Sequence, residues 1–107
     1  MEFVIGIDPG ASGAIAVMDM QGRLAWVKDM PTVEIKIGKA MKRRVSPELL
    51  MQELKFFENK ADAWVEQVTA MPGQGVSSMF AFGESFGIVK GVMAGCGINI
   101  HTATPSK

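Results

Sequence analysis

The sequence has one cysteine, no net charge and no long uninterrupted apolar run, and each shortage excludes a class of protein. Cys96 alone cannot form an intramolecular disulfide, and it suits a reducing compartment, so we expect a cytoplasmic protein. Eleven basic and eleven acidic residues cancel, so binding to nucleic acid requires a local patch. Lys90 interrupts the longest apolar stretch, 87–100, and no signal-like segment opens the chain, so we expect no membrane partner.

What the chain does have is enough apolar sequence for one core, since 48% of its 107 residues are hydrophobic. We therefore expect a single domain over residues 1–107. A β-branched run at 3–8, a glycine-rich turn at 9–13 and a second run at 14–18 predict a β-hairpin, and residues 23–28 predict a third antiparallel strand.

The second half of the sequence alternates between helices and strands. Ser46 as N-cap, Pro47 at the first helical position and Glu48 in the first turn predict the start of a helix. Residues 63–68 and 98–103 read as strands, and the apolar spacing between them predicts a helix over 76–95. The order β-β-β-α-β-α-β indicates an α/β fold with a mixed five-stranded sheet.

The predicted helix over 76–95 carries a glycine at every fourth position, which lowers its intrinsic stability. A ridge without side chains allows another backbone to approach closely. We expect that backbone to be the domain's own sheet, with a partner helix across a two-fold axis as the alternative. The four glycines are Gly83, Gly87, Gly91 and Gly95.

Two acids stand near the carboxyl ends of predicted strands, Asp8 in "GIDPGASG" and Glu66 in "WVEQV". If these strands are parallel neighbours, both carboxylates reach the same edge of the sheet. Oxygen ligands favour Mg²⁺ or Mn²⁺ over zinc, and such ions serve metal-dependent nucleases. The alternatives are an Asx-type turn at Asp8 and an ordinary polar strand end at Glu66.

Residues 31–45 read as a loop or an excursion from the sheet, because Pro31 and Gly38 interrupt any period and basic residues crowd the segment. This stretch holds the concentrated positive charge of the chain and is a candidate for phosphate contacts, with a solvated loop as the alternative. A second, weaker candidate is the glycine-rich start of the later helix. The candidate nucleic-acid-binding residues are Lys36, Lys39, Lys42, Arg43, Arg44, Gly73, Gln74, Ser77 and Ser78. We expect Phe80 in the core or an interface and His101 to be structural.

The segments "IGIDPGASGAIAVMD" and "WVEQVTAMPGQGVSSMFAFGESFGIVKG" together resemble the RuvC-like Holliday junction resolvases of the RNase H-like fold, especially their phage-type relatives. The resemblance covers the chain in order. It implies a magnesium-dependent endonuclease for four-way DNA junctions in recombination, with Asp8 and Glu66 as catalytic metal ligands. It also implies a homodimer formed partly by the helix after Glu66.

The sequence departs from this family at its end. Family members continue past the fifth strand into a helix that supplies the remaining acids, whereas this sequence stops at Lys107. We therefore expect a C-terminally truncated domain with little activity by itself, which retains DNA binding and dimerisation. An uncovered sheet face would then favour association into a dimer or a higher oligomer.

Two other functions stay open at the level of sequence. "GIDPGASG" also resembles the first phosphate loop of actin-like ATPases and sugar kinases, although those proteins place two such domains around the nucleotide. The glycine-rich helix alternatively fits a non-catalytic protein interaction module.

Overall fold

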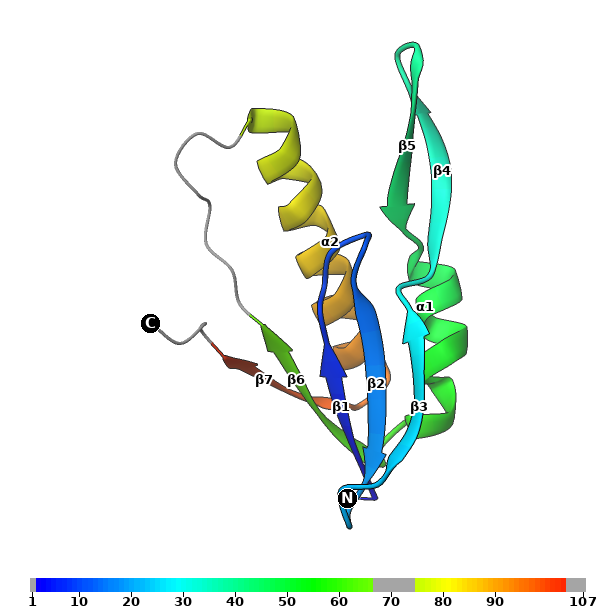
Figure 1. Ribbon diagram of the computed structural model, residues 1–107, viewed down its shortest axis with the longest axis vertical. Coiled ribbons are helices and arrows are strands. Elements are labelled where there is room, and N and C mark those ends of the chain that lie inside the picture. The colour runs from blue at the N-terminus through cyan, green and yellow to red at the C-terminus, as the bar shows by residue number, and fades with distance from the viewer. Residues whose placement is uncertain (1, 67–74, 104–107) are drawn as a thin grey trace.

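The computed structural model describes residues 2–66 and 75–103, and it contains two layers and a projecting hairpin (Figure 1). The order is three strands, a hairpin, a helix, a strand, a helix and a strand. The elements are β1 (Phe3–Ile7), β2 (Ala14–Asp19), β3 (Leu24–Asp29), β4 (Thr32–Ile37), β5 (Ala40–Val45), α1 (Pro47–Leu54), the 3₁₀ turn η1 (Lys55–Phe57), β6 (Ala61–Glu66), α2 (Val76–Gly95) and β7 (Asn99–Ala103).

A mixed five-stranded sheet forms the first layer, with the strand order β3-β2-β1-β6-β7. The first three strands pair antiparallel, whereas β1 pairs parallel with β6 and β6 pairs parallel with β7. The predicted α/β fold is therefore confirmed, and so is the parallel pairing of the strands that carry the two acids.

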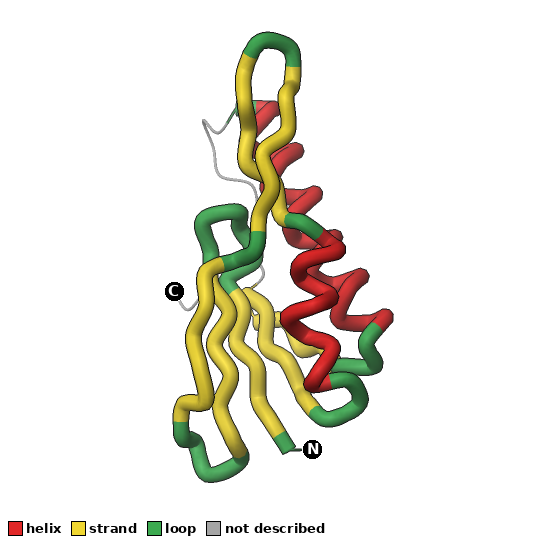
Figure 2. Tube along the Cα trace, turned by 90° about the vertical axis from the view of Figure 1, so that its right-hand side faces the viewer, coloured by secondary structure: helices red, strands yellow, loops and turns green. Residues whose placement is uncertain are grey.

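The core lies between one face of the sheet and the two helices. Alternate residues such as Ile5, Ile7 and Val65 are buried on that face, where Leu50 of α1 and Met93 of α2 cover them. Among the described residues, both helices lie on this side of the sheet (Figure 2), and no helix covers the opposite face.

The segment predicted as a loop or an excursion over 31–45 is the β4–β5 hairpin, which leaves the main sheet, so the prediction of a loop is wrong. Gly38 has a positive φ of 63° and lies in the two-residue connection between the strands, where glycine favours a tight hairpin turn. Val33, Ile35 and Ile37 alternate with polar residues at a period of two, a strand pattern that the surrounding charge obscured. The hairpin projects past the carboxyl ends of β1 and β6 (Figure 1).

Helix α2 begins and ends at the predicted residues, but its glycine ridge does not pack on the sheet. Among residues 2–66 and 75–103, a Cβ atom at any of the four ridge glycines would have no atom within 4 Å, and all four glycines are exposed. The expectation that the domain's own sheet approaches this ridge is therefore wrong. The inward face of α2 is formed instead by Ser85, Val89 and Met93.

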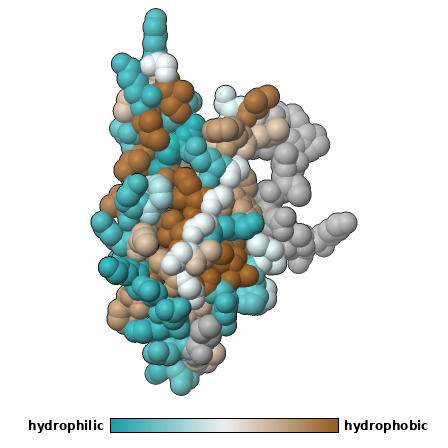
Figure 3. Space-filling model, turned by 180° about the vertical axis from the view of Figure 1, so that it is seen from behind, coloured by the Kyte–Doolittle hydropathy of each residue, from teal (hydrophilic) through white to brown (hydrophobic). Residues whose placement is uncertain are grey.

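Viewed from the helix side, apolar surface gathers in the middle of the molecule (Figure 3). A 520 Å³ groove between α1 and α2 contributes to it, with Met51, Val92, Gly91 and Gly95 among its lining residues. The ridge glycines at the carboxyl end of α2 thus border an open apolar groove. Within residues 2–66 and 75–103, no helix is long and apolar enough to cross a membrane.

Candidate functional site

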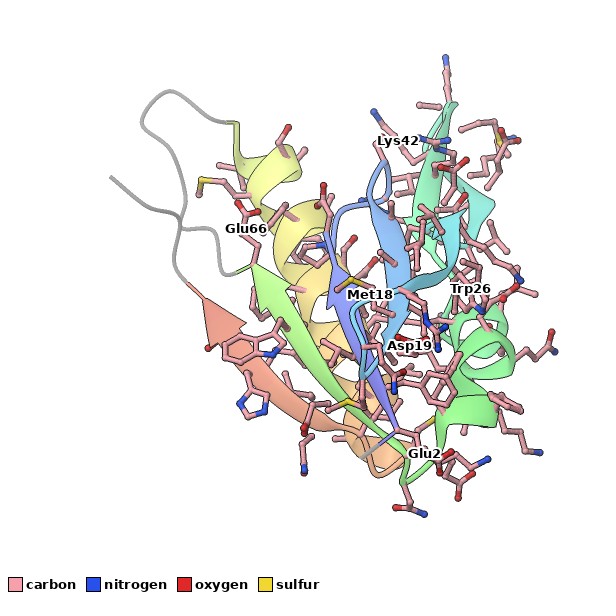
Figure 4. All side chains as sticks on the ribbon, turned by 60° about the horizontal axis from the view of Figure 1, so that its bottom comes forward. Glu2, Met18, Asp19, Trp26, Lys42 and Glu66 are labelled. Carbon is pink, nitrogen blue, oxygen red and sulfur yellow. The ribbon has the colours of Figure 1, made fainter. Side chains whose placement is uncertain are left out.

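Asp8 and Glu66 occupy matching positions at one edge of the sheet. Ile7 of β1 is in register with Val65 of β6, and the two acids are the next residues along these parallel strands. Ile7 and Val65 are buried, whereas both acids are exposed. Figure 4 shows Glu66 at the carboxyl end of β6. Parallel pairing therefore places two acidic residues that are far apart in the sequence at neighbouring positions of the sheet edge.

The turn after Asp8 fixes the backbone at this edge. The backbone N–H of Asp8 donates to the carbonyl of Ala14 at 3.0 Å, and Gly13 donates to the carbonyl of Gly10 at 2.9 Å. Oδ1 of Asp8 accepts a long hydrogen bond of 3.4 Å from the N–H of Gly10, which is the predicted Asx-type contact. Pro9 is buried, so the turn is anchored in the fold.

The donor set at this edge fits a hard cation but fills only part of its coordination sphere. Carboxylate oxygens suit Mg²⁺ or Mn²⁺, which usually retain several waters. Over residues 2–66 and 75–103, no group of three or more histidine, cysteine, aspartate or glutamate side chains is arranged to hold a metal ion. The two acids by themselves thus offer an incomplete site.

The predicted basic residues fall into two groups on the β4–β5 hairpin. Lys36, Lys39 and Lys42 are exposed toward its distal end, and Figure 4 labels Lys42. The two arginines lie at the base and attach the hairpin to the body. Arg43 donates to the Ser12 hydroxyl at 2.9 Å, and Arg44 Nε lies 3.7 Å from Glu84 Oε1.

The start of α2 supplies the second predicted group. Ser77 and Ser78 are exposed in its first turn, and Gly75 is the N-cap without a side-chain cap. Ser78 lines a 180 Å³ pocket with Arg43, Arg44 and Gly10, so the turn after β1, the hairpin and α2 meet there. Gly73 and Gln74 lie outside the described residues.

Two aromatic features were missed in the sequence. His101 of β7 stacks on Trp64 of β6 with ring centroids 4.6 Å apart, and its Nε2 lies 3.6 Å from Asp62 Oδ1. The register Trp64↔His101 produces this pair, and only strand pairing reveals it. Phe80 is 66% exposed, so of the two expected places, the core or an interface, the core is excluded and the interface stays a prediction.

No family model matches the chain, and no curated protein matches its sequence. Solved structures do match, and two of them are structures of RuvC. A structure of T. thermophilus RuvC in complex with a Holliday junction substrate matches with a TM-score of 0.60 at 13% identity, over 98% of this chain and 66% of that chain. A second Thermus thermophilus RuvC structure matches with a TM-score of 0.51 at 17% identity, over 96% of this chain and 64% of that one.

At these identities the similarity concerns the fold. The chain spans about two thirds of the length of both RuvC chains and matches them along nearly all of its own length. Together with the strand order and the two helices on one side of the sheet, this shows that the chain has the RuvC-like, RNase H-like fold.

Proposed function

We propose that this chain acts in DNA recombination as a metal-dependent endonuclease domain of the Holliday junction resolvase type, or as a copy that retains junction binding and dimerisation. The observation that carries the proposal is the register of β1 and β6, which aligns Asp8 with Glu66 at one edge of a RuvC-like sheet. The junction complex of the T. thermophilus protein supports branched DNA as the ligand.

Asp8 and Glu66 would hold Mg²⁺ or Mn²⁺ through their carboxylate oxygens. A bound divalent ion supplies Lewis-acid activation of a phosphodiester and lowers the pKa of an attacking water. Asp8 is positioned by the hydrogen-bonded turn from Gly10 to Gly13, and Glu66 by its place in β6. Two carboxylates by themselves orient a cation incompletely. We therefore expect this chain to bind DNA but to have little cleavage activity.

The hairpin provides the phosphate contacts in this proposal. Lys36, Lys39 and Lys42 are exposed on an arm that projects beyond the sheet edge carrying the two acids (Figure 1). Backbone phosphates bind such lysines without regard to sequence, which suits recognition of a branched structure. Ser77 and Ser78 border the same end of the molecule, and Gly73 and Gln74 stay predictions.

We further propose a homodimer through the outer face of α2, since the exposed glycine ridge has no partner among the described residues. A higher oligomer would also cover the open sheet face. The buried thiol of Cys96 is compatible with a cytoplasmic location.

The proposal predicts that the chain binds a four-way junction more tightly than a linear duplex of the same sequence. Binding is measured by fluorescence anisotropy with EDTA or with Mg²⁺, and cleavage by gel electrophoresis of labelled junction strands. Asp8→Asn and Glu66→Gln remove a ligand charge, so we expect them to abolish the Mg²⁺-dependent part of binding and any cleavage. Glu58→Gln, an exposed glutamate before β6, is the matched control.

Equal affinity for junction and duplex, without any effect of Mg²⁺, would refute the proposal. Thermal stabilisation by ATP in place of junction binding would favour the actin-like ATPase alternative. A dimer indifferent to both DNA and metal would favour the interaction module.

A further inference from the structure

We propose that the free edge of β4 pairs antiparallel with the β4 edge of a second copy of this chain, which joins the two-stranded sheets of both hairpins into one continuous sheet. This contact differs from the proposed homodimer through α2, because it is made by the projecting arm. It involves neither DNA nor metal, so it goes beyond the proposed function and can be tested separately.

The outer edge of β4 has backbone groups without a partner strand. β4 pairs with β5 alone, and β5 packs beside α2, so β4 lies on the outside of the arm (Figure 1). Ile37 and Ala40 flank the two-residue turn and therefore form a hydrogen-bonded pair. By alternation, the N–H and C=O groups of Thr32, Glu34 and Lys36 point away from β5. No described residue outside the hairpin forms a backbone hydrogen bond with these groups. Such an edge is a template for another strand.

The sequence of β4, TVEIKI, is complementary to itself in the antiparallel direction. With Ile35 on the two-fold axis, Glu34 lies opposite Lys36 of the second copy, and the reverse pair forms by symmetry. The same alignment places Val33 opposite Ile37 of the second copy. Glu34 and Lys36 have outward-pointing backbone groups, so they form the hydrogen-bonded pairs of this register. Charge, apolar side chains and backbone groups thus favour one and the same register.

The side chains of β4 also gain from this pairing. Val33, Ile35 and Ile37 lie on one face of the strand and are 43%, 42% and 46% exposed, and pairing removes part of their apolar surface from water. On the opposite face, neither Glu34 nor Lys36 forms an ion pair within the described residues. Each of them gains an opposite charge from the second copy.

The positive charge of the arm opposes this pairing only weakly. Lys42, Arg43 and Arg44 lie on β5, which becomes an outer strand of the joined sheet. At about 4.8 Å between neighbouring strands, the two β5 strands are roughly 14 Å apart, which exceeds the screening length of about 8 Å at physiological salt. The two turns point in opposite directions, so the Lys39 side chains lie at opposite ends of the sheet.

Disulfide trapping of the full chain tests the register. A shared edge of six residues is far smaller than the roughly 1,000 Å² of a stable interface, so we expect pairing at high protein concentration. In Ile35→Cys, the new cysteine meets its own copy at a non-hydrogen-bonded position, where Cα atoms are about 4.5 Å apart and a disulfide can form. Mild oxidation followed by non-reducing gel electrophoresis is expected to show a covalent dimer.

Ile37→Cys is the matched control. It lies on the same face of β4 with similar exposure, but its copy is roughly 14 Å away, which is too far for a disulfide. The native Cys96 is 2% exposed and does not compete. Mixing Val33→Cys with Ile37→Cys is expected to give a mixed dimer, because these positions lie opposite each other.

Charge reversal in the Ile35→Cys background tests the chemistry of the pairing. Glu34→Lys places two lysines opposite each other and is expected to lower the initial rate of dimer formation roughly 5- to 30-fold. Adding Lys36→Glu restores opposite charges in both pairs, so the rate is expected to recover. Circular dichroism melting of each variant establishes that it is folded.

The inference is overturned if Ile37→Cys forms a dimer as fast as Ile35→Cys, because the contact is then random collision. It is also overturned if the double charge reversal does not recover the rate. Gly87→Leu in the Ile35→Cys background should leave the rate unchanged, and loss of the dimer would attribute the contact to α2 instead. A chain that pairs through β4 but binds no junction contradicts only the proposed function.

Discussion

Gly13 determines the turn that holds Asp8 at the sheet edge. A Cβ atom at Gly13 would overlap the carbonyl of Asp8 and lie 2.9 Å from the carbonyl oxygen of Gly10. Both obstacles are backbone, which cannot move aside as a flexible side chain does. The glycine is therefore required by space, and the identity of one small residue positions a candidate metal ligand.

We predict that Gly13→Ala lowers the free energy of unfolding by roughly 1–3 kcal/mol, the usual cost of overpacking. Gly10→Ala, in the same turn, is the control because its nearest contacts are 4.0 Å away. Urea denaturation followed by circular dichroism measures both. Equal stability of Gly13→Ala and Gly10→Ala would contradict the steric argument.

Asp19 is a residue whose titration links the stability of the fold to pH. The backbone N–H of Arg23, at 2.9 Å, is the main cause that lowers the pKa of Asp19, and the Arg23 side chain and Gln21 N–H add to it. Because the folded pKa is lowered, this stabilisation is present above the unfolded pKa of about 3.9 and is lost as pH falls through the folded pKa.

Asp19→Asn is therefore predicted to lower the melting temperature at pH 7, with a difference from wild type that shrinks as the pH falls below about 4. Glu2→Gln, at another exposed carboxylate, serves as control. Thermal melts at several pH values test this. A difference that is constant with pH would show that the Asp19 charge is not the cause.

At the scale of elements, α1 depends on its cap. The Ser46 Oγ accepts a hydrogen bond from the N–H of Leu49 at 3.2 Å, and Ser46 itself is 1% exposed. Ser46→Ala is expected to cost about 1 kcal/mol of unfolding free energy, as for other N-caps. Ser77→Ala, in the exposed first turn of α2, should change stability little. Chemical denaturation of both variants provides the comparison, and equal midpoints would contradict the capping role.

The orientation of the β4–β5 hairpin depends on contacts between its base and the rest of the molecule. Its two strands pair only with each other and form a sheet separate from the main one. Arg43 and Arg44 connect its base to Ser12 and to Glu84. These two side-chain contacts add to the backbone hydrogen bond from Ser46 N–H to the Pro31 carbonyl and to the buried Val45 in holding the base of the arm, while its lysines stay exposed.

At the scale of the whole molecule, the open surfaces predict self-association. Apolar area lies in water on the glycine ridge of α2 and on the sheet face that no helix of the described residues covers, where Val27 is 55% and Trp64 50% exposed. We expect light scattering to give at least twice the 11.5 kDa chain mass. Gly87→Leu places a bulky side chain on the ridge and is expected to shift the mass to the monomer.

Glu2→Leu adds an exposed leucine away from α2 and is the control for nonspecific hydrophobic association. A single 11.5 kDa species for the wild type at all concentrations would count against association. A dimer that tolerates Gly87→Leu would place the contact elsewhere, for instance on the sheet face.

Features that depend on neighbouring residues could be predicted from the amino-acid order alone. The strand before Asp8, the Ser46 cap and the ends of α2 follow from β-branched runs, capping chemistry and apolar spacing, all of which act within a few positions. The hairpin over 32–45 was missed because dense charge and Gly38 obscured its alternation.

Features that depend on residues distant in the chain are set by strand pairing and packing. Asp8 meets Glu66 only because β1 and β6 pair in parallel, and Phe80 faces a groove only because the hairpin stands beside α2. The side of α2 on which the glycine ridge lies, toward the sheet or toward solvent, also could not be predicted. The fourfold spacing identifies one helix face but gives no information on what that face contacts. Local interactions form the elements, whereas long-range packing decides which of their residues come together.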